Sequence, residues 1–265
     1  MTGGVAALHP LSAFLRPWLG DAAGLPDLNR LAREGGLTTG NCAPLSFVPP
    51  PSDDLGYEER AWLSGEVATR PDNRHDFFNA LIWLAFPRSK AALNRRHYAA
   101  LLESRRHGGA ARGTLRDALT QFDECGVLIA GTSLGLWEAL GAHRWRELFV
   151  ERREELMRST RFLVFGHASH DLLGKPFVGL CGKALFIEVD APWLGLPANE
   201  ALAQLDAHLA DMFDSREFSP CDWQPLPLLG IPGATADNEQ ADYYDDARQF
   251  RPARTMRPGS SPGNR

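Results

Sequence analysis

The sequence predicts an α+β fold that is mainly helical, with a small and largely antiparallel sheet. Segments with helical periodicity dominate, runs of β-branched and aromatic residues are short and few, and the end of the chain is rich in proline. Of the 265 residues, 44% are hydrophobic and 23% are charged, which is enough apolar material for one large or two small globular domains.

Three regions follow one another, and we expect them to form one compact domain. Residues 1–73 are rich in glycine and proline and predict a loop-rich N-terminal cover. Residues 74–217 carry the regular patterns and form the predicted α+β core. Residues 218–265 predict a Pro-rich extended segment, with a frayed tail over 254–265.

The core begins with a predicted helical hairpin. The segment from Arg74 to Phe86 is apolar on nearly every side, which is typical of a buried helix. Pro87 then predicts a stop, and Ser89 is the expected N-cap of a second helix that runs to about Glu103.

The segment from Thr114 to Thr132 has two interpretations. We favour a β-hairpin, because two apolar runs flank Asp123–Gly126, a short polar turn that ends in glycine. In the alternative, Leu115–Asp123 is an amphipathic helix capped by Gly126, and periodicity alone does not exclude it.

The other elements follow from the same two patterns. We expect helices at Asp27–Glu34, Tyr57–Val67, Leu134–Leu140, Arg144–Met157, His167–Leu173 and Asn199–Phe213, and strands at Arg161–Phe165 and Lys183–Val189.

Composition and charge argue against several classes of protein. The net charge of -5 is unlike that of a nucleic-acid binder with a basic face. The uncharged stretches are shorter than the roughly 18 apolar residues of a membrane span, and the N-terminus lacks a signal-peptide pattern. The four cysteines form no C-x-x-C pair, so neither a zinc ribbon nor a redox motif is present. We expect a soluble cytoplasmic protein that binds neither nucleic acid nor membrane, and the oligomeric state stays open.

Polar residues on the first core helix mark a candidate site. His75, Asp76 and Asn79 lie in an otherwise apolar segment. Buried imidazole and carboxylate groups cost several kcal/mol unless they are paired, so these residues form an internal network or a site. In the structural alternative, Asp76 pairs with a buried arginine such as Arg116, and His75 bonds a backbone carbonyl.

The adjacent His75-Asp76 pair is similar to the metal-ligating doublet of HD-type phosphohydrolases. That family also needs an upstream histidine on a helix, whereas His9 lies in an apparent loop. A divalent metal is therefore possible but not favoured, and no cofactor is predicted.

His167 stands where a predicted strand runs into a short helix. Free backbone N–H groups and the helix dipole there lower the proton affinity of the imidazole, so a neutral His167 could act as a base or ligand. His170 and Asp171 follow at helical spacing and could add ligands on the same face. In the alternative, one histidine is structural and the other two residues are exposed.

Further polar residues are candidates for binding a substrate. Arg116 is the most specific of them, because its guanidinium always carries a charge and suits a carboxylate or phosphate. The full set of candidate binding residues is Asn79, Arg88, Lys90, Asn94, Arg116, Asp123 and Lys183. No Walker loop, G-x-G-x-x-G fingerprint or G-x-S-x-G elbow occurs, so neither a nucleotide fold nor an α/β-hydrolase triad is supported.

Most of the chain resembles a bacterial family catalogued as domain of unknown function 3025. The signature is Phe78–Pro87 followed by Lys90 and Asn94. The similar blocks are His75–Asn94, Arg112–Gly126, Phe165–Lys183, Leu228–Gly233 and Phe250–Arg254. The resemblance implies no activity.

Together these observations favour an enzyme of hydrolytic or acid–base type that acts on a small anionic substrate. In this hypothesis His167 is the base, Asp76 orients a histidine, and Arg116 with Lys90 receives negative charge. The rival hypothesis is a non-catalytic binding or assembly protein, whose Trp- and Pro-rich segments 191–197 and 223–233 form a contact surface.

Overall fold

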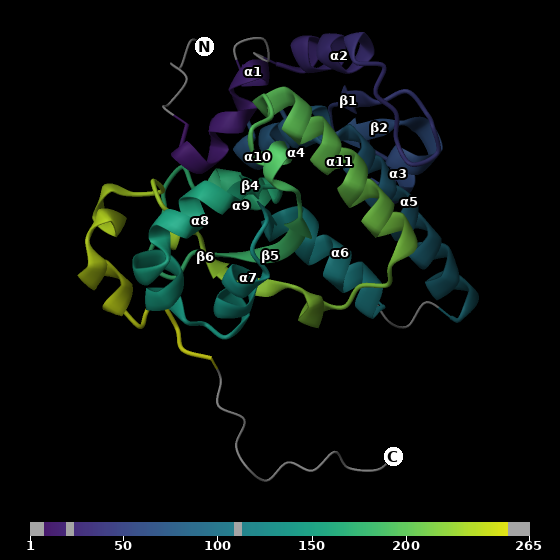
Figure 1. Ribbon diagram of the computed structural model, residues 1–265. Coiled ribbons are helices and arrows are strands. Elements are labelled where there is room, and N and C mark those ends of the chain that lie inside the picture. Colours follow the sequence, from purple (N-terminus) through teal and green to yellow (C-terminus); the bar gives the residue numbers. More distant parts are fainter. Residues whose placement is uncertain (1–7, 20–23, 109–112, 254–265) are drawn as a thin grey trace, which may run out of the picture.

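A computed structural model describes residues 8–19, 24–108 and 113–253, and the predicted tail at 254–265 lies outside this range (Figure 1). The fold is α+β and mainly helical, as predicted. The elements before residue 74 are a 3-10 helix at Pro10–Leu15, α1 (Arg16–Leu19), α2 (Leu25–Glu34), β1 (Ser46–Val48), α3 (Tyr57–Ser64) and β2 (Glu66–Ala68). β1 and β2 pair in parallel, and Phe47 and Val67 from this pair are buried in the same core as α4.

The predicted helical hairpin is confirmed as α4 (Arg74–Ala85) and α5 (Pro87–Arg106). The expected N-cap at Ser89 is wrong. Pro87 itself occupies the first turn of α5, where a missing N–H leaves no helix bond unmade. Ser89 is buried, and its hydroxyl donates to the backbone carbonyl of Asp206 at 3.0 Å.

The favoured β-hairpin at 114–132 is wrong, and the helical alternative is right. Thr114–Cys125 forms α6, which buries Ala118, Leu119 and Phe122 along one face. This spacing is the apolar stripe of an amphipathic helix, so packing of that stripe decides against a strand. The polar residues assigned to a hairpin turn are the last turn of α6, and Gly126 opens the next strand.

The larger sheet has four strands among the described residues: β3 (Gly126–Gly131), β4 (Thr160–Val164), β5 (Cys181–Glu188) and β6 (Gln224–Pro227). The strand order is β4-β3-β5-β6. The β3–β4 and β5–β6 pairings are antiparallel and β3–β5 is parallel, so the sheet is mixed. All six residues of β3 are buried, as expected for a strand covered on both faces.

Helices cover both faces of this sheet (Figure 1). Leu128 and Leu185 face the core formed with α4, α5, α6 and α11 (Ala198–Ser215), and α11 packs along α5. Val127 and Ala184 face a second core formed with α7 (Leu134–Gly141), α8 (Arg153–Ser159) and the chain after β6. The short helices α9 (His167–Leu172) and α10 (Ala191–Leu194) follow β4 and β5.

One predicted helix is interrupted, and the two tryptophans of the predicted contact surface are buried. A π-helix at Glu147–Glu151 precedes α8, where the sequence predicted a continuous helix over 144–157. Trp193 and Trp223 are both buried, and Trp223 Nε1 donates to the carbonyl of Ala118 at 3.0 Å. These two indoles are therefore core side chains rather than a contact surface. Within the described ranges, the helices lack the combination of length and apolar character that crossing a bilayer requires.

Candidate functional site

Three helices bring two histidines and one glutamate together. We call His75 of α4, Glu124 of α6 and His167 of α9 the histidine cluster. The two Nε2 atoms lie 3.1 Å apart. Glu124 Oε2 lies 3.6 Å from Nε2 of His167 and 4.0 Å from Nε2 of His75. The side chains of His75 and Glu124 are 36% and 39% exposed, whereas that of His167 is 5% exposed, so the cluster opens to solvent on one side.

A close backbone contact sets His167 against Glu124. Gly166 links β4 to α9, and a Cβ at this position would lie 2.4 Å from the carbonyl oxygen of Glu124. The backbone N–H groups of Phe165 and Gly166 both donate to the carbonyl of Gly126, at 2.8 and 2.9 Å. Only glycine allows the β4–α9 turn to approach the end of α6 this closely.

The first turn of α4 is fixed from two sides, which places His75. Asn73 caps the helix, since its Oδ1 accepts from the N–H of Asp76 at 2.9 Å. Arg74 Nε donates to Asp171 Oδ1 at 3.0 Å, which joins α4 to α9 beside the two histidines. The N-terminal turns of α4 and α9 therefore face each other with their imidazoles in contact.

A buried ion pair lies behind His167. Asp123 Oδ2 is 3.7 Å from Nδ1 of His167, and Asp123 Oδ1 accepts from Nζ of Lys90 at 2.5 Å. Lys90 also donates to Oδ1 of Asn79 at 3.0 Å, and the Asn79 amide donates to the hydroxyl of Tyr57 at 2.9 Å. This series of side-chain contacts, from Tyr57 to His167, thus leads from the core to the open side of the cluster.

Burial and charge set the protonation of these groups. Burial lowers the pKa of His167 to about 4, against the opposing effect of the Asp123 carboxylate, so the ring is neutral near pH 7. Burial alone would lower the pKa of Lys90, but the Asp123 charge raises it above its ordinary value. Burial alone would raise the pKa of Asp123, yet Lys90 and His167 lower it. Burial and the Asp123 charge raise the pKa of Glu124.

The cluster offers two kinds of chemistry. The neutral His167 ring or the Glu124 carboxylate can take a proton from a water molecule on the open side of the site. The donor atoms of the cluster, which all lie within 4.8 Å of one another, could also hold a metal ion. The identity of the residues allows both uses, because two imidazole nitrogens and one carboxylate oxygen are common zinc ligands.

Asp76, predicted to orient a histidine, points elsewhere. Its Oδ2 accepts from the backbone N–H and Nε of Arg70, both at 2.8 Å, and its Oδ1 accepts from Nη2 at 2.9 Å. The structural alternative paired Asp76 with a buried arginine such as Arg116, whereas the partner is Arg70, which is 57% exposed. The same alternative gave His75 a bond to a backbone carbonyl, whereas His75 bonds His167. Asp123 stands behind His167 in the position expected of Asp76.

The predicted binding residues lie in several places. Asn79, Lys90 and Asp123 form the buried chain behind the cluster, and Lys90 is 2% exposed, so it is enclosed rather than open to a substrate. Asn94 is structural: it accepts from the N–H of Gly40 at 3.2 Å and donates to Glu58.

The three remaining candidates are not among the residues that form the histidine cluster or the network behind it. The backbone N–H of Arg88 donates to Asp206 at 3.0 Å, at the contact of α5 with α11. Arg116 lies two turns before Asp123 on α6, with a buried Nε that has no hydrogen-bond partner in the described part of the chain. Lys183 pairs in register with Gly126, at the same end of the sheet as Glu124.

His170 and Asp171 do not join His167 in a set of ligands. His170 is buried, with Nδ1 2.7 Å from the hydroxyl of Ser12 and Nε2 2.9 Å from the carbonyl of Val164. Asp171 pairs with Arg74. The spacing was right for a shared helix face, but α9 is short and its turns contact different neighbours.

Glu124 is the cluster residue that the sequence analysis missed. The hairpin interpretation placed it in a solvent-exposed turn, where an acidic residue is ordinary. The helical alternative contained the signal, because it put Asp123 and Glu124 side by side at the end of a helix that leads into a buried strand.

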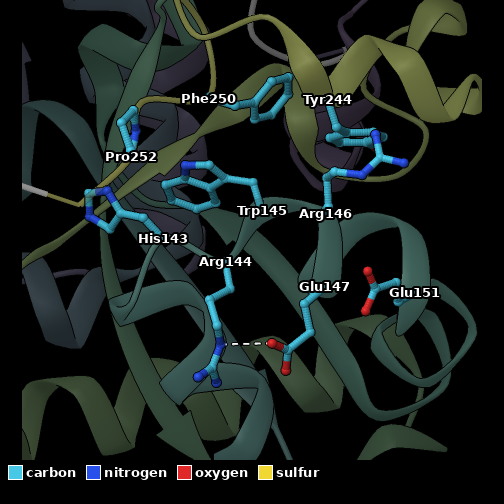
Figure 2. Close-up of a pocket in the computed structure, with 9 residues that line it drawn as sticks. All are labelled: His143, Arg144, Trp145, Arg146, Glu147, Glu151, Tyr244, Phe250 and Pro252. Carbon is cyan, nitrogen blue, oxygen red and sulfur yellow. Dashed lines mark ion pairs between the residues drawn. The ribbon is translucent and has the colours of Figure 1, made fainter.

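A hollow on another part of the surface contains none of the predicted site residues (Figure 2). Its lining comes from the segment that holds His143 and Trp145 and from the chain near Tyr244 and Phe250. The indole of Trp145 donates to the carbonyl of Arg251 at 2.7 Å. This bond joins the lining of the hollow to the last residues that the structure describes. Arg144 and Glu147 form an ion pair of 2.7 Å in the lining, but the described residues of the lining include a single histidine, so the pair of imidazoles found in the histidine cluster is not repeated there.

Comparison with known proteins identifies a family whose description names no function. No curated protein and no solved structure matches the chain. The family model described as Protein of unknown function (DUF3025) matches residues 45–254, which include all three residues of the histidine cluster. Because this match covers well over half of the chain, the protein belongs to the DUF3025 family.

Proposed function

We propose that this protein is a hydrolytic enzyme whose reaction takes place at the histidine cluster. One observation carries the proposal: the Nε2 atoms of His75 and His167 converge to 3.1 Å beside the carboxylate of Glu124, on the open side of an otherwise buried network. A water molecule bound there would lie beside the Glu124 carboxylate and the imidazole pair, which can accept its proton and so activate a weak nucleophile.

Asp123 and Lys90 act in this proposal as positioning residues. The Asp123 carboxylate faces Nδ1 of His167 at 3.7 Å and favours the tautomer that carries its proton on Nδ1. In this tautomer Nε2, which faces His75, is unprotonated and can accept a hydrogen bond. Lys90 neutralises Asp123 and holds it at 2.5 Å. This arrangement differs from the predicted one, in which Lys90 received the charge of the substrate.

The proposed substrate is a small ester or phosphoester with an anionic group. Lys90 is enclosed, so a substrate anion must meet another positive group. Arg74 precedes His75 on α4 and its side chain is 56% exposed, although it also pairs with Asp171. A guanidinium with free donors on its outer edge suits a carboxylate or phosphate.

The test is a hydrolysis assay with purified protein and a panel of p-nitrophenyl carboxylic and phosphoric esters. His75→Ala and Glu124→Gln should each lower kcat/KM at least about 100-fold, since each removes a group that contacts the reacting water. His107→Ala is the matched control, because His107 is an exposed histidine at the end of α5, and it should keep full activity.

Circular dichroism and thermal unfolding must show that both variants fold like the wild type. Hydrolysis that survives in both folded variants would refute the proposal, and so would a loss of the same size in His107→Ala.

A further inference from the structure

The histidine cluster has the form of a metal centre, and we propose that it binds one divalent transition-metal ion of the zinc class. The ligands would be Nε2 of His75, Nε2 of His167 and a carboxylate oxygen of Glu124, with the open side left for water or substrate. This inference deepens the proposed function, because it names the agent that would activate the water.

The distances fit three ligands around a common ion. Zinc ligands lie about 2.0–2.2 Å from the metal, so two of them in a tetrahedral arrangement are about 3.3 Å apart. The two histidine nitrogens are 3.1 Å apart, and Glu124 Oε2 is 3.6 and 4.0 Å from them. Glu124 is partly exposed at the last turn of α6, so a small rotation of its side chain would complete the set.

The surroundings of His167 are those of a metal ligand. A histidine that binds metal through one ring nitrogen usually directs the other toward a carboxylate, which fixes the ring. Asp123 takes this place behind Nδ1 of His167, and Lys90 in turn fixes Asp123. Nδ1 of His167 is buried and has no hydrogen-bond partner in the described chain, and the Asp123 carboxylate lies 3.7 Å from it, so a small shift of either side chain would join the two.

The three ligands stand on helices that contact one another. α4 and α9 are tied by the Arg74–Asp171 ion pair, and the end of α6 is in backbone contact with the turn at Gly166. Three ligands held on packed helices need little ordering when an ion binds, which favours affinity.

The donor set selects the class of metal. Two imidazoles and one carboxylate suit zinc and its neighbours in the transition series, whereas Mg²⁺ and Ca²⁺ prefer oxygen ligands. Three protein ligands with an open position are typical of a catalytic rather than a structural zinc site. A metal there would also supply the positive charge that the enclosed Lys90 cannot offer a substrate.

The binding test uses the full chain, first stripped with a chelator and dialysed. Calorimetric titration with Zn²⁺ should show one saturable equivalent, and Mg²⁺ should show none. Co²⁺ should give the visible absorption of a four- or five-coordinate site. His75→Ala and Glu124→Gln alter partly exposed positions and should remove this binding without unfolding the chain, and His107→Ala should retain it.

A separate variant tests the role of Asp123. Asp123→Asn keeps the shape of the side chain but leaves Lys90 without its counter-charge, so binding is measured in protein that circular dichroism shows to be folded. In that folded protein Zn²⁺ binding should be about 10- to 100-fold weaker, the usual effect of losing the partner of a metal-binding histidine. Binding that is absent in the wild type, or that persists in both His75→Ala and Glu124→Gln, would overturn the metal assignment.

Failure of this inference and failure of the proposed function give different results. Hydrolysis by the chelated protein, with no ion bound, would refute the claim that a metal activates the water, and the proposal that the protein is a hydrolase would stand. Binding of Zn²⁺ that depends on His75 and Glu124, without hydrolysis in the metal-loaded protein, would support the metal and refute the hydrolase.

Discussion

Lys90 is a charge that the fold encloses completely, and Asp123 is its counter-charge. The ammonium bonds Asp123 and Asn79 and lies 5.4 Å from the centre of the Trp83 ring. An enclosed pair of this kind adds little net stability, but removal of one partner leaves the other uncompensated.

We predict that Lys90→Met destabilises the protein by about 3–5 kcal/mol, because the Asp123 carboxylate stays buried without its cation. Urea unfolding measures the change. Lys175→Met, at an exposed lysine, is the control and should change the free energy of unfolding by less than about 0.5 kcal/mol. The double variant Lys90→Met/Asp123→Asn should recover part of the loss. Equal stability of the two lysine variants would contradict this account.

Asp76 allows a second prediction for a single residue. Its partner, Arg70, is 57% exposed, whereas the Asp76 side chain is 12% exposed, so water screens the arginine side of the ion pair. Asp76→Asn keeps some of the hydrogen bonds and should cost only about 1–2 kcal/mol, with Zn²⁺ binding and hydrolysis unchanged. Unfolding curves and the hydrolysis assay test this together. Lost hydrolysis with stability intact would instead favour the catalytic role that the sequence suggested.

At the scale of elements, the contact between Gly166 and the end of α6 decides whether the cluster assembles. We predict that Gly166→Ala destabilises the protein by about 1–3 kcal/mol and weakens Zn²⁺ binding, because the new Cβ would press on the backbone of Glu124 and Cys125. Gly195→Ala is the matched control, since its nearest neighbour, the carbonyl of Pro192, is 3.4 Å away.

The two readouts of this prediction are thermal unfolding and calorimetric titration. A Gly166→Ala protein with wild-type affinity for Zn²⁺ would show that the backbone contact does not position His167.

The sequence patterns of α4, α5 and α11 predicted helices, whereas the favoured prediction at α6 was a hairpin. Length does not explain the difference, because α4 and α6 both have 12 residues. In α6 the apolar residues fit a strand run and a helix stripe alike, and the choice depends on a core that comes from distant parts of the chain.

The same limit applies to the site. His75 was identified as a polar residue in an apolar segment, and His167 by its position where a predicted strand runs into a helix. Glu124 was missed because of the wrong hairpin prediction. The pairing of Lys90 with Asp123 joins residues 33 positions apart, and local pattern does not reveal which of two helices meets which. Sequence reasoning thus found groups capable of chemistry, and the packing of helices determined their partners.

At the scale of the whole molecule, a second buried histidine joins the N-terminal segment to the core. The His170 ring stacks on Phe78 of α4, with centroids 5.5 Å apart, and its two nitrogens contact the hydroxyl of Ser12 and the carbonyl of Val164. Three separate parts of the chain therefore contact one imidazole. Because this ring is buried and can bind a proton, the free energy of unfolding depends on pH.

Burial lowers the pKa of His170 to about 4 from an ordinary value of 6.5. Between these values the unfolded chain binds a proton that the folded chain does not, so the free energy of unfolding falls as the pH falls. For the metal-free protein we predict that His170 accounts for a loss of about 2 kcal/mol between pH 7 and pH 5.

Urea unfolding at both pH values measures the total loss in the wild type and in His170→Gln. Glutamine does not titrate in this range, so the variant should lose about 2 kcal/mol less than the wild type over the same interval, even if it is less stable at pH 7. The same pH dependence in both proteins would mean that His170 is already able to bind its proton in the folded state.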